Sequence, residues 1–141
     1  MKTSNAAELN GTAFRWNFGG WFGSAVGGMA CMAGLFWSYY QAGDRVGAGA
    51  MLTLMVAFAF AAVITWMRRD TISAYVALQS TVVGTGLAGL VAMGLAQVRP
   101  MPVEMARWLP VIPLMAAGLF IRFWLMERSA SKASREASCD L

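Results

Sequence analysis

Very few side chains in this sequence could do chemistry, and two candidates lie inside long apolar segments. Gln79 lies in the segment from residue 72 to residue 98, and Arg122 lies four residues before Met126, where the last apolar segment ends. Polar side chains inside apolar segments are candidate functional residues, because they are costly to place in hydrocarbon. One hypothesis is that Gln79 and Arg122 line a polar vestibule that accepts an anion or a lipid phosphate. The interpretation that we favour is that Arg122 extends its guanidinium to the lipid headgroups.

Sulfur-containing side chains form the second group of candidates. Soft ligands for copper could come from Met29, Cys31 and Met32, or from Met101 and Met105 beside Glu104. On a helix, however, Cys31 faces away from Met29, and methionine is a common filler of apolar interiors. We therefore expect no metal site.

The residue types that are missing narrow the chemistry further. The sequence contains no histidine, which excludes imidazole-ligated haem, the usual zinc sites and a Ser-His-Asp triad. Cys31 and Cys139 lie more than 100 residues apart, so we expect no disulfide. No acidic residue lies within an apolar segment, which removes the carboxylate relay of a proton-coupled exporter. We expect no catalytic residue and no cofactor.

Small residues at helical spacing form the most unusual pattern in the chain. One row contains Gly19, Gly23 and Gly27 and continues to Cys31, a second row contains Gly20, Ser24 and Gly28, and a weaker row contains Gly84, Ala88 and Ala92. Two adjacent rows of small residues form a flat face that another helix can approach closely, and such packing drives helix association in lipid. The pattern predicts an assembly surface, within the chain or between chains. The plainer interpretation is packing within one compact bundle.

The composition indicates the solvent in which these residues lie. Apolar residues make up 58% of the 141-residue chain and charged residues only 13%, whereas a soluble domain carries about 25% charged residues. Half of the charges lie within the first 15 and last 15 residues. The remaining charges are too few to cover a water-soluble domain, so the composition excludes a cytosolic enzyme.

Four apolar segments are long enough to cross a bilayer, which takes about 20 helical residues. We predict transmembrane helices at residues 18–40, 46–67, 72–98 and 108–126. The first two connections are too short for anything but tight turns between antiparallel helices. The predicted fold is therefore all-α, an integral membrane four-helix bundle with short loops. Residues 1–17 are expected to form an interfacial segment, and residues 127–141 a polar tail that is a frayed helix or disordered.

The distribution of lysine and arginine predicts the orientation of the helices. One side receives Lys2, Arg15, Arg68, Arg69, Arg128, Lys132 and Arg135, with Arg122 close by, and the other side receives Arg45, Arg99 and Arg107. The positive-inside rule then places both termini in the cytoplasm, with the chain in the inner (plasma) membrane. The net charge of +4 is concentrated at the ends of the apolar segments, where it meets anionic headgroups. We expect the lipid bilayer as a partner, and no nucleic acid.

Two classes of function agree with these features. The first is a non-catalytic structural or accessory subunit that packs through its glycine-rich helices against copies of itself or a larger membrane complex. The second is an oligomeric channel or transporter for ions or small solutes, with a path lined by Thr, Ser, Gln79 and glycine carbonyls. An intramembrane enzyme has almost no support, because neither paired carboxylates nor an activated cysteine is present.

Overall fold

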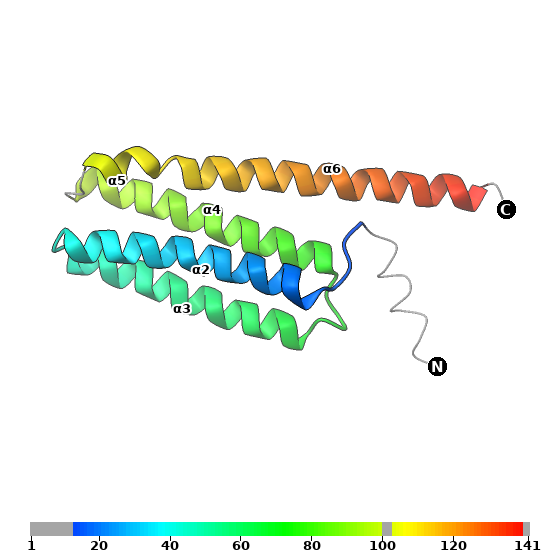
Figure 1. Ribbon diagram of the computed structural model, residues 1–141, viewed down its shortest axis with the longest axis horizontal. Helices are drawn as coiled ribbons and strands as arrows, with labels where there is room; N and C mark the ends of the chain where they lie inside the picture. Colours follow the sequence, from blue (N-terminus) through cyan, green and yellow to red (C-terminus); the bar gives the residue numbers. More distant parts are fainter. Residues whose placement is uncertain (1–12, 100–102, 140–141) are drawn as a thin grey trace.

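The computed structural model describes residues 13–99 and 103–139, and within these ranges it contains helices and turns but no strand. The helices are α2 (Phe18–Gln41), α3 (Arg45–Met67), α4 (Ala74–Val98), α5 (Val103–Trp108) and α6 (Val111–Cys139) (Figure 1). The predicted all-α architecture is confirmed. Most of the predicted N-terminal segment lies outside the described residues.

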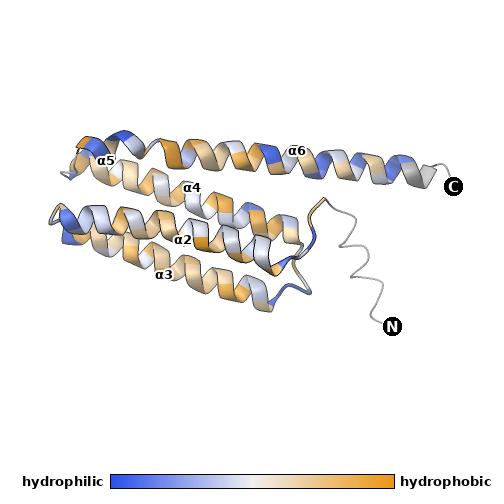
Figure 2. Cartoon of the chain, in the orientation of Figure 1, coloured by the Kyte–Doolittle hydropathy of each residue, from blue (hydrophilic) through white to orange (hydrophobic). Residues whose placement is uncertain are grey.

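Three stretches of helix are long and apolar enough to cross a membrane. They are Arg45–Met67, Ala74–Val98 and Ala106–Glu136. Helix α2 has 24 residues, but its many glycines contribute little hydropathy, and it is not among the three. In Figure 2 hydrophobic residues run along the bundle, whereas hydrophilic residues gather at the turns and along the last turns of α6.

Polar side chains determine where three of the long helices begin. The Asn17 side chain accepts a hydrogen bond from the Gly19 N–H at 3.0 Å, and Asp44 accepts one from the Val46 N–H at 3.2 Å. Ser73 caps α4 in the same way. Each cap satisfies a backbone donor that the first turn of a helix leaves without a partner. Gly43, in the turn before Asp44, has a φ of 74°, a conformation that side chains other than glycine rarely adopt.

The four long helices do not pack equally against one another. Helices α2, α3 and α4 contact each other, whereas α6 makes extensive contact only with α4. Figure 1 shows this arrangement, with α6 along α4 at one side of the bundle and α3 on the other side. The bundle is therefore a three-helix unit with a fourth helix attached to one of its members.

The polar tail is helical, so of the two expected states, a frayed helix and a disordered segment, the structure shows the helix. Helix α6 continues without a break to Cys139. Its last turns contain no glycine or proline and are rich in Ala, Lys, Arg and Glu, which favour helix. Within these turns Lys132 pairs with Glu136 at 3.8 Å, four residues apart, and Ser129 donates to the Leu125 carbonyl. Local propensity and i,i+4 pairs therefore extend the helix.

Two clusters of buried side chains form the core. One lies near the α2–α3 turn and contains Leu35, Tyr39, Ala48, Met51, Ala92 and Leu109. The other lies at the opposite end and contains Trp21, Ala25, Ala62 and Ala77, with Trp16 and Trp66 packed against it. Trp21, near the start of α2, is therefore a buried core residue.

Candidate functional site

The predicted glycine rows of α2 and α4 meet around one aromatic side chain, Phe58 of α3. A Cβ added to Gly28 would lie 2.7 Å from Phe58 Cζ and 2.7 Å from Thr85 Oγ1. A Cβ added to Gly84 would lie 3.1 Å from Phe58 Cε2. The two glycines therefore make room for the ring, which lies between α2 and α4. We call Gly28, Phe58 and Gly84 the glycine clamp.

Other predicted small residues also lie between α2 and α4. The hydroxyls of Ser24 and Thr81 are 3.3 Å apart, within hydrogen-bonding distance. Ala88 is buried, and Ala92 is 0% exposed. The Ala92 carbonyl accepts a buried hydrogen bond of 2.8 Å from the Tyr39 hydroxyl. Ser24 and Gly28 of the second row of α2, and the row of α4, thus serve packing within the chain.

Among the described residues, no helix packs closely against the first row of small residues on α2. Gly19, Gly23 and Gly27 are exposed, and we call them the α2 glycine face. In the part of the chain that the structure describes, a Cβ at Gly23 or Gly27 would meet nothing within 4 Å, and one at Gly19 would meet only the Asn17 side chain at 3.6 Å. Gly20 and Cys31 are exposed as well. Packing among the described residues therefore does not account for this row.

A groove runs between α2 and α6, with α4 as its floor. This α2–α6 groove has a volume of about 320 Å³. Its walls include Gly27 and Cys31 on α2 and Met115, Leu119 and Phe123 on α6. The groove exists because both helices pack on α4 and make little contact with each other.

A second cavity, of about 260 Å³, lies at the N-terminal end of α2, and we call it the mouth cavity. Its lining includes Arg15, Asn17, Trp21, Ser24 and Phe123. Ser24 and Phe123 also line the α2–α6 groove, so the two hollows adjoin.

Gln79 and Arg122, the residues of the hypothetical vestibule, have different surroundings. Gln79 is 7% exposed, and its Nε2 donates to the Tyr75 hydroxyl and to the Phe120 carbonyl, both at 3.1 Å. It therefore joins α4 to α6. Arg122 is exposed on α6, and neither residue lines the mouth cavity or the groove.

The sulfur-containing candidates also have different surroundings. Met32 is buried in the bundle, whereas Cys31 is exposed beside the groove. No group of three or more His, Cys, Asp or Glu residues that could hold a metal ion occurs in residues 13–99 and 103–139. Met101, from the other proposed group, lies outside the described residues.

An ion pair that we did not predict joins the α2–α3 turn to the end of α4. The Asp44 carboxylate lies 2.7 Å from Arg99 Nη1, and the Asp44 side chain is only 5% exposed. Burial would raise the pKa of the Asp44 carboxyl, but the nearby N–H of Gly47 and the Arg99 guanidinium outweigh burial and lower that pKa. The sequence could have indicated this pair, because Asp44 and Arg99 both lie in connections that are predicted to be on the same side of the membrane.

A basic surface along the last turns of α6 was also missed. A cavity of about 640 Å³ is lined by residues that include Tyr75, Trp124, Arg128, Lys132 and Arg135. The Arg128 guanidinium lies 5.2 Å from the Trp124 ring centroid, a cation–π contact. The three cations follow at helical spacing, so helix formation in the tail is what brings them together.

The described residues thus offer an uncovered glycine face, an apolar groove and basic surfaces at one end. These features are suited to packing and to binding an amphiphile. No protein-family model, curated protein or solved structure matches this chain.

Proposed function

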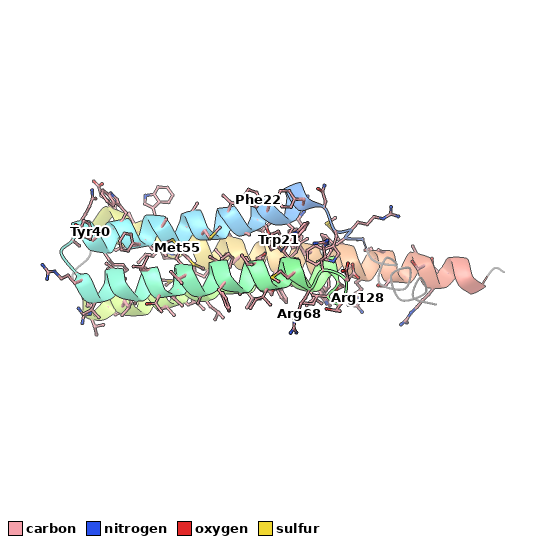
Figure 3. All side chains as sticks on the ribbon, turned by 90° about the horizontal axis from the view of Figure 1, so that it is seen from below. Trp21, Phe22, Tyr40, Met55, Arg68 and Arg128 are labelled. Carbon is pink, nitrogen blue, oxygen red and sulfur yellow. The ribbon has the colours of Figure 1, made fainter. Side chains whose placement is uncertain are left out.

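We propose that this chain is a small polytopic protein of the inner (plasma) membrane, with all four long helices spanning the bilayer and both termini in the cytoplasm. The placement is supported by three helices of sufficient length and hydropathy and by α2, which contacts two of them along its length. Arg68 and Arg128 lie at one end of the bundle and Tyr40 at the other (Figure 3). The richer cationic end faces the cytoplasm in this proposal.

Cysteine labelling tests the orientation. In a background with Cys31→Ser and Cys139→Ser, Ser134→Cys is expected to react with an impermeant maleimide only in inverted vesicles. Gln41→Cys, at the other end of the bundle, is expected to react only in right-side-out vesicles. Labelling of both positions from the same side contradicts the proposed topology.

In this proposal the chain has a structural role, as a non-catalytic accessory subunit. It associates through the α2 glycine face with copies of itself or with a larger membrane complex. The observation that carries the proposal is that this face has no partner within the described chain. Close backbone approach at glycines is a main source of helix association in lipid, where bulky apolar side chains gain nothing by leaving the bilayer. An uncovered row of glycines therefore favours a helix from another chain.

Disulfide crosslinking in native membranes tests the assembly. In the same cysteine-free background, Gly23→Cys places a thiol on the α2 glycine face, and Val63→Cys places one at similar depth on the exposed surface of α3. We expect mild oxidation to yield a crosslinked dimer, or a crosslink to another protein identified by mass, for the Gly23 variant only. Equal crosslinking of both variants, or crosslinking of neither, would contradict the proposal.

A further inference from the structure

We propose that the α2–α6 groove binds one anionic phospholipid of the surrounding membrane, with its phosphate at the mouth cavity near Arg15 and one acyl chain along Gly27 and Cys31. The proposal rests on the membrane placement given above. Gly27 belongs both to the α2 glycine face and to the groove, whereas Gly19 and Gly23 do not line the groove, so the two proposals are tested at different residues.

The depth of the two adjoining hollows corresponds to one leaflet. The mouth cavity begins at Arg15 and Asn17, and the groove reaches Cys31. From Phe18 to Cys31 the helix rises about 20 Å at 1.5 Å per residue. One leaflet with its headgroups is roughly 20 to 22 Å thick. An acyl chain that enters beside the headgroup level would therefore run to the membrane centre.

The lining of the groove suits hydrocarbon better than a polar solute. Its hydroxyl groups are already engaged: Thr81 donates to the Leu78 carbonyl at 2.8 Å, and Thr85 donates to the Thr81 carbonyl at 2.9 Å. Such bonds within one helix occupy the hydroxyl donors of these threonines, which are then not available to a polar solute in the groove. The opposite wall is formed by Met115, Leu119 and Phe123.

The shape of the groove favours a thin chain over a helix from a second protein. It has a volume of about 320 Å³ and is bounded by α2 on one side, α6 on the other and α4 below. Gly19 and Gly23 of the α2 glycine face do not line the groove, and among the described residues no helix lies against them, so a partner helix and a lipid would occupy adjacent surfaces of α2 that meet at Gly27.

The mouth cavity carries the features that a phosphate needs. It lies at the N-terminal, positive end of α2, whose first turn contains no acidic residue. Arg15 contributes a full positive charge to its lining. Trp21 also lines it, and among the described residues the Trp21 indole N–H has no hydrogen-bond partner although the side chain is only 7% exposed. A buried donor without an acceptor is costly. The nitrogen is enclosed, so a phosphate oxygen in the cavity would satisfy it after a shift of the Trp21 ring.

Native mass spectrometry of the protein extracted from vesicles tests the proposal. The vesicles contain equal amounts of phosphatidylcholine and phosphatidylglycerol, and flotation with the vesicles first establishes insertion. We expect one phosphatidylglycerol to remain bound per wild-type chain. Arg15→Gln is expected to lower the preference for phosphatidylglycerol about fivefold, the effect of one cation near an anionic headgroup. Arg68→Gln, which removes an exposed cation at the same end outside the cavity, should leave the preference unchanged.

A variant that fills the groove provides a second test of lipid binding. Cys31→Phe places a ring in the groove and is expected to remove most of the retained lipid. Ala33→Phe adds the same ring to an exposed position of α2 that does not line the groove, and it should retain the lipid. Circular dichroism confirms folding of both variants, and if Cys31→Phe does not fold, Arg15→Gln decides alone.

Three outcomes overturn the proposal: no retained phospholipid in the wild type, equal loss in each variant and its control, or loss of oligomers instead of lipid in Cys31→Phe. The same spectra report the number of chains. Gly23→Leu, which blocks the α2 glycine face, is expected to abolish oligomers while keeping the lipid. Failure of the assembly and failure of the lipid site are therefore distinguishable.

Discussion

The glycine clamp predicts that replacing Gly28 with alanine destabilises the protein, although alanine favours helices. A Cβ at this position would lie 2.7 Å from both Phe58 Cζ and Thr85 Oγ1. The Phe58 ring has little room to move away from Gly28, because Gly84 lies on the other side of the ring. A Cβ added to Gly84 would lie only 3.1 Å from Phe58 Cε2. Contacts below about 3 Å force neighbouring groups to shift, and such overpacking costs about 1–3 kcal/mol.

The same helix provides a matched control. Gly34 is exposed, and a Cβ there would meet nothing within 4 Å among the described atoms. Gly34→Ala should therefore be neutral or stabilising by up to about 1 kcal/mol, the helix preference of alanine over glycine. Gly28→Ala gains the same preference but pays for the clash, so we expect its free energy of unfolding to fall below that of Gly34→Ala by about 1–3 kcal/mol.

The measurement is reversible unfolding in mixed micelles of a mild detergent and dodecyl sulfate, followed by tryptophan fluorescence, at concentrations at which the chain is monomeric. Phe58→Leu tests the cause, because a smaller side chain should accept the extra methyl group. In the double-mutant cycle of Gly28→Ala with Phe58→Leu we expect a favourable interaction energy of about 0.5–3 kcal/mol. Equal stabilities of Gly28→Ala and Gly34→Ala, or an interaction energy of zero, would refute the argument.

Three further predictions concern the rest of the molecule. The pKa of Asp44 is lowered in the folded state, so its contribution to stability is complete above about pH 5 and is lost as pH falls through that lowered pKa. Unfolding measurements at a series of pH values should show this fall in the free energy of unfolding, and Arg99→Gln should make the fall smaller. Tyr39→Phe should lower the free energy of unfolding by about 1 kcal/mol through loss of the buried bond to the Ala92 carbonyl, whereas Tyr40→Phe, at an exposed position, should not. Proteoliposomes with the wild-type chain should show background permeability to ions and small solutes, and sustained flux would favour the channel alternative.

The sequence predicts the helices well because their determinants are local. Long apolar segments, short polar connections and the capping residues Asn17, Asp44 and Ser73 all lie in or next to the helix that they specify. The small residues of α2 and α4 could likewise be recognised from spacing alone. What spacing leaves open is which row meets a neighbour: Gly28 contacts Phe58, whereas Gly27, the adjacent residue, faces open space.

The remaining features depend on contacts between distant parts of the chain. That Phe58 fills the space between two glycines follows from the relative positions of three helices, which no single segment specifies. The same holds for the pair of Asp44 with Arg99, separated by 55 residues. The α2–α6 groove depends on α6 packing mainly against α4. The polarity of the tail is compatible with a frayed helix or with disorder, whereas its Ala, Lys, Arg and Glu residues favour a helix.

The attachment of α6 to a single neighbour also has a consequence for biogenesis. All contacts among α2, α3 and α4 involve residues up to Val98, so these helices can close into a unit while the rest of the chain is still being translated. Chains generally fold from the N-terminal side during synthesis. Helix α6 would then join last, by docking from the lipid onto a surface of α4 that is already complete. The α2–α6 groove would therefore form only at that step.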